Sequence, residues 1–343
     1  MVKRTRPVAT SKPLAIQTED LDPEPAAWLA QRCELVQCPS DDPRFAALLP
    51  GARALIVRTY TRVNAAMLDR APRLKVVARA GVGVENIDIP ACNARGIKVV
   101  HTPGANTRAV VEFVGALLAD ALRPRLFINR ALPTPEWHKV RRETIAAKQL
   151  DELALGIWGF GRIGSAVARV AAAYNMRTLY NDLLEIPAAD RSGAEPVSVD
   201  RLLGESDIVT LHVDGRPSNK GLVNAAAFAR MKPTVLFLNT SRGFMLDAAA
   251  LAGFLRRNPG ARAMIDVHDP SEPITPDYPL LGVPNATLSP HLAAGTEKAK
   301  RNMSWVVRDV WRVLSGEGLD DLAQSLSKAL DEFTALMGVK LAG

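Results

Sequence analysis

The chain has 343 residues, 48% hydrophobic and 23% charged, which indicates a folded globular protein of about two domains rather than a disordered chain. No stretch approaches the ~18 uninterrupted apolar residues of a membrane span, and residues 1–17 lack the apolar segment of a signal peptide, so we expect neither a membrane partner nor secretion. The formal net charge is +7, but no basic cluster lies in a recognisable nucleic-acid-binding motif, so we interpret these clusters mainly as solvated surface.

The first 104 residues alternate short apolar runs with amphipathic stretches, a pattern typical of a parallel α/β sheet. Four apolar runs, each followed by a polar or glycine-containing turn, are predicted strands: residues 14–17, 54–57, 76–78 and 98–101. The cysteines of the chain, Cys33, Cys38 and Cys92, lack the paired short spacings of a zinc site. We therefore expect a small α/β domain with reduced thiols, a cytoplasmic location and no metal.

A helix is predicted to begin at about Thr107, with Asn106 available as its N-cap. Apolar residues recur through it at spacings of three and four, from Val110 to Leu122. Residues 123–148 are basic and are interrupted by prolines, which indicates a connecting segment.

A second series of strands follows this segment. Six apolar runs are predicted strands: residues 154–158, 177–180, 208–212, 234–239, 263–267 and 286–289. Helical patterns separate them, and six strands with crossovers are the number expected of a doubly wound dinucleotide-binding fold. From Lys298 the chain returns to helix. Residues 319–337 carry apolar side chains at spacings of three and four, which predicts an amphipathic helix that packs on the chain's own first domain in preference to a second subunit.

A glycine-rich loop, Gly159-Phe160-Gly161-Arg162-Ile163-Gly164, lies between the predicted strand 154–158 and a predicted helix. This is the context in which a GxGxxG motif binds a dinucleotide. Gly159 permits the tight turn, Gly161 lets the backbone approach a pyrophosphate, and Gly164 lets the helix and strand pack closely. The N–H groups at the start of the helix would then hold the pyrophosphate.

Asp182 ends the next predicted strand, 18 residues after Gly164. A carboxylate at this place accepts hydrogen bonds from the hydroxyls of the adenosine ribose and repels a 2′-phosphate. Leu183 and Leu184, which follow it, supply no cation for such a phosphate. The motif therefore favours NAD over NADP as the cofactor.

Three polar residues lie just beyond strand ends in the second series, at the edge where open α/β sheets bind ligands: Arg242, Glu272 and His291. Hydride transfer from a hydroxy acid needs a cation for the carboxylate and the C2 oxygen, a base that titrates near neutral pH, and a carboxylate that orients this base. The residue types fit this chemistry. Taken alone, however, each of them also fits a structural role: a hydrogen-bonded histidine, a surface ion pair or a turn.

Six motifs resemble those of the D-isomer-specific 2-hydroxyacid dehydrogenases, in the same order and at similar spacing. They are the glycine loop and residues 78–89 (ARAGVGVENIDI), 212–223 (HVDGRPSNKGLV), 239–243 (NTSRG), 266–273 and 289–295. The resemblance covers roughly residues 50–315 and is greatest to phosphoglycerate dehydrogenase-like members. It implies an NAD-dependent dehydrogenase of a small anionic 2-hydroxy or 2-oxo acid of the 3-phosphoglycerate, hydroxypyruvate or glyoxylate type.

The resemblance also implies roles for individual residues. It makes Arg242, Glu272 and His291 the catalytic residues. For the cofactor it adds to the glycine loop a set of residues at strand ends: Asp182, His212, Val213, Thr240, Ser241, Asp266, His291 and Ala293. For the substrate it implies Arg58, Asn106 and the loop Arg79-Ala80-Gly81-Val82-Gly83, whose backbone N–H groups would hold the carboxylate.

Two doubly wound domains are implied by the same resemblance. An NAD-binding Rossmann domain of residues 105–297 would be inserted in a flavodoxin-like substrate domain of residues 1–104 and 298–343, and the protein would be a homodimer. Two alternatives stay open: an NAD-binding corepressor-like regulator, and a dehydrogenase of another small acid such as formate.

The sequence departs from the family pattern at two places. Asp266 and Glu272 are six residues apart where the family commonly shows five, so Asp269 competes with Glu272 as the partner of His291. Residues 214–216, Asp-Gly-Arg, stand where Pro-Leu-Thr is more usual, which could alter the floor of the NAD site.

Overall fold

The structure, a computed structural model, describes residues 12–123, 125–270 and 272–317. The chain forms two compact units. The first runs to Asn106 and resumes at Glu297, and the second comprises Thr107–Thr296, so the second unit is inserted in the sequence of the first. The predicted helix at residues 319–337 lies outside the described residues.

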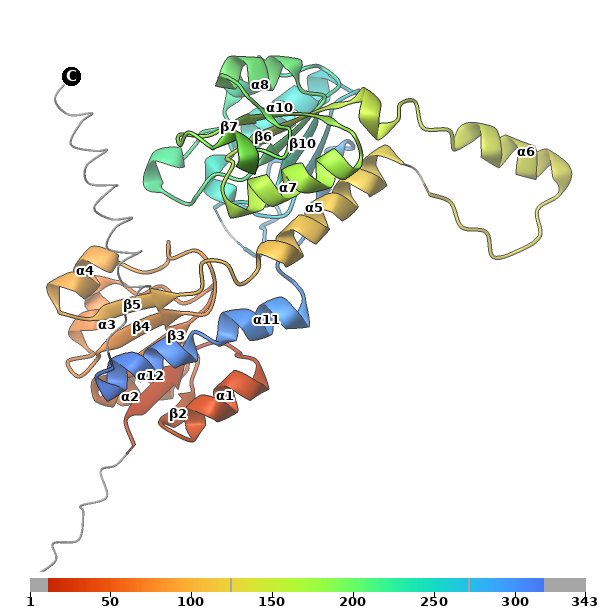
Figure 1. Cartoon of the computed structure of the whole chain (residues 1–343). Helices are drawn as coiled ribbons and strands as arrows, with labels where there is room; N and C mark the ends of the chain where they lie inside the picture. Colours follow the sequence, from red (N-terminus) through yellow and green to blue (C-terminus); the bar gives the residue numbers. More distant parts are fainter. Residues whose placement is uncertain (1–11, 124, 271, 318–343) are drawn as a thin grey trace, which may run out of the picture. The chain divides into compact units, whose positions relative to one another are not determined.

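The first unit is built on a five-stranded parallel sheet of order β2-β1-β3-β4-β5 (Figure 1). Its strands are β1 (Leu14–Gln17), β2 (Glu34–Gln37), β3 (Ala54–Val57), β4 (Val76–Arg79) and β5 (Lys98–His101). This order is that of a flavodoxin-like doubly wound sheet, which confirms the predicted fold class. The helices are α1 (Pro23–Ala30), α2 (Pro43–Leu48), α3 (Ala65–Asp69), α4 (Ile89–Ala94), α11 (Glu297–Ser304) and α12 (Val307–Ser315).

Helix α12 explains why the chain must return to the first unit. Val307 and Val310 of this helix are buried in one apolar cluster with Ile56 of β3 and Ala78 of β4. Without residues 297–317 this face of the sheet would expose its apolar side chains to water.

The second unit contains a seven-stranded, all-parallel sheet of order β12-β11-β10-β9-β6-β7-β8. Its strands are β6 (Ala154–Trp158), β7 (Arg177–Asn181), β8 (Glu195–Pro196), β9 (Ile208–Leu211), β10 (Leu236–Asn239), β11 (Arg262–Ile265) and β12 (Ala286–Leu288). Strand β6 is flanked by β7 on one side and β9 on the other. The order therefore reverses at β6, and open α/β sheets bind ligands at this kind of point.

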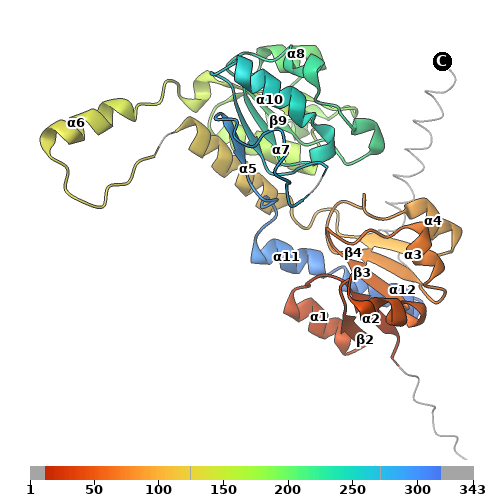
Figure 2. The ribbon, with the colours of Figure 1, turned by 180° about the vertical axis from the view of Figure 1, so that it is seen from behind.

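Helices cover both faces of the second sheet (Figures 1 and 2). Helices α5 (Thr107–Leu122) and α7 (Arg162–Ala173) bury one face. Helices α8 (Val199–Glu205), α9 (Ala225–Phe228) and α10 (Ala248–Arg257) bury the other face. None of the helices in the described part of the chain has both the length and the apolar character that crossing a bilayer requires.

The second unit differs from the prediction in two places. Strand β8 was not predicted because it has only two residues, both exposed, at the edge of the sheet. The segment predicted to be a connection contains helix α6 (Thr134–Glu143), which has no buried residue and extends away from the sheet of its unit in both views (Figures 1 and 2).

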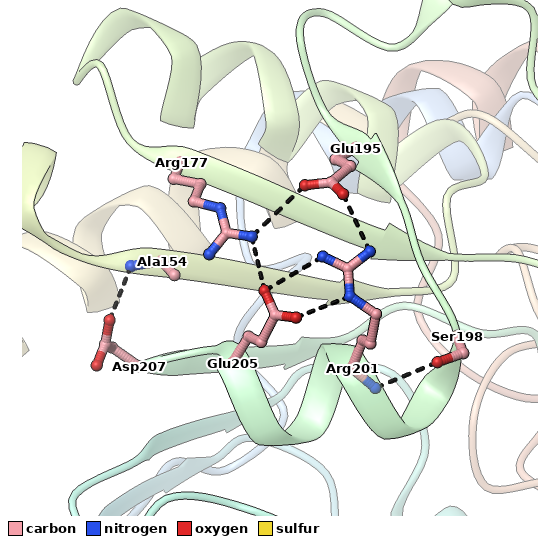
Figure 3. A network of polar contacts seen from close by, with 7 residues as sticks. All are labelled: Ala154, Arg177, Glu195, Ser198, Arg201, Glu205 and Asp207. Carbon is pink, nitrogen blue, oxygen red and sulfur yellow. Dashed lines mark hydrogen bonds and ion pairs between the residues drawn. The ribbon is translucent and has the colours of Figure 1, made fainter.

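Four charged side chains tie the β8 edge of the second unit to α8 (Figure 3). Arg177 Nη2 lies 2.6 Å from Glu205 Oε2, and Arg201 Nε lies 2.7 Å from Glu205 Oε1. Arg201 also contacts Glu195 of β8 at 3.1 Å. The network is exposed, so we expect salt to screen it.

Candidate active site

The glycine loop connects β6 to α7 in the second unit. Each of its three glycines fits its position for a different physical reason. Gly159 has a φ of 96°, and a Cβ placed there would lie 2.5 Å from the backbone of His212 and Val213. A Cβ at Gly164 would lie 2.1 Å from the Gly159 carbonyl oxygen. At Gly161, by contrast, a Cβ would meet nothing within 4 Å. Open space beside the N-terminus of a 12-residue helix fits an anionic pyrophosphate.

Asp182 follows β7 and lies against the glycine loop. Its Oδ2 accepts a hydrogen bond from the Phe160 N–H at 2.5 Å, and its Oδ1 accepts one from the Leu184 N–H at 2.9 Å. These backbone donors fix the orientation of the carboxylate. It can therefore serve as an acceptor for ribose hydroxyls next to the loop that would hold the pyrophosphate.

Two cations lie near Asp182, although neither of its neighbours in sequence is charged. Arg216, in the loop after β9, donates from Nε to Asp214 Oδ1 at 2.7 Å. The hydrogen bond with Asp214 raises the pKa of Arg216, and the negative charge of Asp182 adds to this effect. Arg191 and Asp182 line the same cavity of about 310 Å³. The sequence shows the unusual Asp-Gly-Arg, but no spacing in it indicates that Arg216 lies near Asp182, because the two loops are far apart in the chain.

The loops after β9 and β10 are joined to each other and to the end of β6, which leads into the glycine loop. Ser241 Oγ donates to the Val213 carbonyl at 2.7 Å, and the His212 N–H donates to the Trp158 carbonyl at 2.7 Å. Burial lowers the pKa of His212 to about 4, so its imidazole is neutral at neutral pH. Thr240 Oγ1 is buried and has no hydrogen-bond partner among the described residues. Such an orphaned hydroxyl fits a site that a ligand completes.

His291 and Glu272, the predicted acid/base pair, are in contact. His291 Nδ1 lies 2.7 Å from Glu272 Oε2, whereas no such contact is found in the described residues for Asp269, the competing carboxylate. Burial alone would raise the pKa of Glu272, but hydrogen bonds from His291 and from the His268 N–H outweigh it, so this pKa lies below its ordinary value. The backbone of His291 is left-handed, with a φ of 56°. Backbone strain of this kind is often found at functional sites.

Asp266 holds the loop that carries His291. The Asp266 side chain is 1% exposed and accepts from the N–H groups of Leu292 and Ala293, each at 2.8 Å. The His291 N–H donates to the Asp266 carbonyl at 2.9 Å. Contact with the cofactor stays a prediction for Asp266 and Ala293; the contacts seen here fix the backbone on which His291 sits.

Arg242 follows β10, the strand next to β11. A Cβ at Gly243 would lie 2.2 Å from the backbone carbonyl carbon of His268, so Gly243 permits close contact between the Arg242 loop and the segment that leads to Glu272. Because β10, β11 and β12 are parallel neighbours, Arg242, Glu272 and His291 follow strands that end at one edge of the sheet. The geometry brings the three predicted catalytic segments together.

The residues predicted for the substrate lie in the first unit. In the loop after β4, the Ala80 N–H donates to Val57 and the Gly81 N–H to Arg79, and the Arg79 side chain lies over Gly81. His101 Nδ1 contacts the Val82 carbonyl at 2.7 Å and supports the loop from β5.

Arg58 and Asn106 have contrasting surroundings. The guanidinium of Arg58 donates to the Asp20 carbonyl at 2.9 Å, and the Arg58 N–H donates to Glu19. Its side chain thus has an internal partner. Asn106 Oδ1 is buried and has no hydrogen-bond partner among the described residues.

Comparisons with known proteins agree with this geometry. Residues 115–293 match the family described as D-isomer specific 2-hydroxyacid dehydrogenase, NAD binding domain. The chain is 32% identical over 307 residues to glyoxylate reductase from Aeropyrum pernix, which covers 87% of this chain and 91% of that protein. It is 36% identical over 262 residues to D-3-phosphoglycerate dehydrogenase from Archaeoglobus fulgidus, which covers 76% of this chain and 49% of that protein. The chain thus spans about half the length of this second relative.

A solved structure gives the same result. D-lactate dehydrogenase from Aquifex aeolicus, complexed with NAD and lactic acid, matches with a TM-score of 0.76 and 25% identity, over 89% of this chain and 96% of that one.

Proposed function

Because the chain belongs to the D-isomer-specific 2-hydroxyacid dehydrogenases, we propose that it transfers a hydride between NAD and C2 of a small 2-hydroxy or 2-oxo acid. The observation that carries this proposal is the pair of His291 and Glu272, 2.7 Å apart, in the same unit as the glycine loop. An imidazole held by a carboxylate is the acid/base group that this reaction requires.

His291 acts through its second ring nitrogen. Its Nδ1 is bonded to Glu272, so Nε2 is the nitrogen that faces the reacting oxygen. In the reducing direction, Nε2 gives its proton to the C2 carbonyl oxygen, and the hydroxyl O–H bond forms as the N–H bond breaks. The charged carboxylate of Glu272 stabilises the imidazolium before this transfer. When bound, the nicotinamide supplies or accepts the hydride.

In this proposal each unit supplies its own groups for the negative charge of the substrate: Arg242 in the second unit and the loop after β4 in the first. The guanidinium of Arg242 holds the substrate carboxylate and polarises the C2 oxygen. In the loop, the N–H groups of Ala80 and Gly81 already donate within the chain, so we assign the carboxylate to the N–H groups of Val82 and Gly83. Asn106 Oδ1 is a further polar group for the substrate.

We propose a small 2-oxo acid of the glyoxylate or hydroxypyruvate type as the substrate, with 3-phosphoglycerate as the phosphorylated candidate. The relatives include enzymes named for glyoxylate and for phosphoglycerate. Arg58, a predicted substrate-side residue, has an internal hydrogen-bond partner, which favours the unphosphorylated acids. The test is a panel of 2-oxo acids assayed by NADH oxidation, with 3-phosphoglycerate assayed by NAD reduction. Binding of NADH without turnover of any acid would favour a regulatory protein instead.

A homodimer in the cytoplasm completes the proposal. Residues 125–148, which include α6, expose apolar side chains that a monomer would present to water: Phe127 is 85% exposed and Ile145 is 74% exposed. Exposed apolar patches of this kind mark protein interfaces. Light scattering should give a dimer mass, and Phe127→Glu with Ile145→Glu should shift it toward the monomer. The free, buried cysteines support a reducing compartment.

A further inference from the structure

His268 lies at the junction of the three segments that carry Arg242, Glu272 and His291. It follows β11, and its backbone N–H donates to Glu272 Oε1 at 2.9 Å. The other oxygen of this carboxylate contacts His291 at 2.7 Å. Both oxygens of Glu272 are therefore engaged, one by the backbone of His268 and one by the imidazole of His291.

The His268 side chain reaches the segment of His291 from the other direction. Its Nε2 lies 2.8 Å from the Ser289 carbonyl, two residues before His291. A carbonyl only accepts, so the hydrogen-bond pattern assigns a proton to Nε2. The other nitrogen, Nδ1, then accepts from the Tyr278 hydroxyl at 3.3 Å. The two rings pack edge to face, with their centroids 5.3 Å apart.

The Arg242 segment rests on the backbone of the same residue. A Cβ at Gly243 would lie 2.2 Å from the His268 carbonyl carbon and 2.4 Å from its oxygen. The separation between Arg242 and Glu272 therefore depends on where the His268 backbone lies, and the Ser289 and Tyr278 contacts determine that position.

We propose that His268 is a positioning residue, and that its ring, which donates from Nε2 to Ser289, fixes the distance between the Glu272 loop and the Ser289–His291 segment. Its role in turnover rests on the proposed function, but the geometry it sets does not. A shift of this carboxylate by about 1 Å can cost 100-fold in rate without any loss of a reacting group.

Among the described residues, the charged and titratable groups close to the ring include Tyr278, Asp269, Glu272 and His291. Burial, followed by the charges of Asp269 and Glu272, raises the pKa of Tyr278 to about 12. The Tyr278 hydroxyl therefore stays protonated across the working pH range and remains a donor to His268.

Two substitutions of His268 distinguish the contribution of its Nε2 from that of its Nδ1. His268→Gln places an amide nitrogen near the position of Nε2 and can keep the bond to Ser289. His268→Asn is shorter, places its amide near Nδ1 and loses Ser289. We expect His268→Gln to keep kcat/KM within several-fold and His268→Asn to lose about 100-fold. The alkaline limb of the pH profile of kcat/KM should move to lower pH only in His268→Asn. The affinity for NADH should be unchanged in both variants.

A readout independent of turnover is NMR of the histidine ring nitrogens and their protons. The unaltered protein should show the proton of the His268 ring on Nε2 and a downfield proton between His291 and Glu272. The downfield proton should persist in His268→Gln and disappear in His268→Asn. If His268→Asn does not fold, Tyr278→Phe replaces it; this variant should broaden or shift the same downfield proton.

Equal behaviour of the Gln and Asn variants, or an unmoved downfield proton in Tyr278→Phe and His268→Asn, would overturn the proposal. A lower melting temperature with an unchanged pH profile would also overturn it, because it would show a structural role alone. Failure of the proposed function would look different: the unaltered protein would oxidise no NADH, while the NMR signals would still report on His268.

Discussion

Oε2 of Glu272 lies 2.7 Å from Nδ1 of His291, across two loops that follow neighbouring strands. This contact decides between the two carboxylates that the sequence left open, since Glu272 and not Asp269 meets the imidazole. The extra residue between Asp266 and Glu272 is accommodated without loss of the pair.

Replacing Glu272 by Gln should therefore change the pH profile as well as the rate. The charge that favours the protonated imidazole is removed while the shape is kept. In the reducing direction, the descending alkaline limb of kcat/KM should move to lower pH, with a loss of rate in addition. Asp269→Asn is the matched control and should leave the limb in place. The reverse result would make Asp269 the partner.

The stability of the folded protein at acid pH also depends on Glu272. The pKa of Glu272 is lower in the folded protein than its ordinary value. The stability that the charged carboxylate contributes is therefore complete when the pH is above the ordinary pKa. It is lost as the pH falls through the lowered pKa of the folded protein.

The cofactor preference should respond in opposite directions to two substitutions beside the glycine loop. Asp182→Ala removes the repulsion of a 2′-phosphate and should narrow the preference for NADH over NADPH. Arg216→Ala removes a cation near Asp182. It should widen the preference for NADH over NADPH, mainly by lowering the affinity for NADPH. Dissociation constants from calorimetry would check both. Equal affinities for NADH and NADPH in the unaltered protein would contradict the assignment of Asp182.

Two glycines of the loop should give different defects when replaced by alanine. At Gly161 a methyl group enters open space, so the melting temperature should be kept while NADH affinity falls at least tenfold. At Gly164 the methyl group meets the Gly159 carbonyl, so the folded state should lose about 1–3 kcal/mol. If Gly161→Ala binds NADH normally, the pyrophosphate does not lie there.

Acid should weaken the ion-pair network at the β8 edge. Hydrogen bonds from Arg201 and then Arg177 lower the pKa of Glu205 from 4.5 to about 2. The contribution of this carboxylate is therefore complete above about pH 4.5 and is lost as pH falls toward 2. Thermal unfolding at several pH values should show a smaller acid loss in Glu205→Gln than in the unaltered protein. High salt should reduce the difference, because the network is exposed; Asp200→Asn, on the same helix, is a control.

The strands could be predicted largely because most of them are buried on both faces and appear as continuous apolar runs. The exceptions have physical causes. Strand β2 carries polar residues at both ends, and β8 is a two-residue edge, so neither produces such a run. Helix α6 has no buried face and lies in a basic, proline-rich segment, a composition that is typical of a connecting segment.

The candidate site could be predicted where one short motif carries the information, as in the glycine loop. It could not be predicted where the contact joins loops far apart in sequence. The charges of Arg216 and Asp182 interact only because β7 and β9, the strands that precede their loops, flank β6. The position of His268 depends on Gly243, Tyr278 and Ser289 together, and no spacing in the sequence indicates it.

The most direct test of the central claim is single-turnover oxidation of bound NADH by a 2-oxo acid from the panel, compared between the unaltered protein and His291→Gln. Rapid oxidation is expected in the unaltered protein. In His291→Gln the rate should fall by about 10²–10⁴, with NADH affinity kept. Equal rates in the two proteins, or no oxidation by any acid in an unaltered protein that binds NADH, would contradict the central claim.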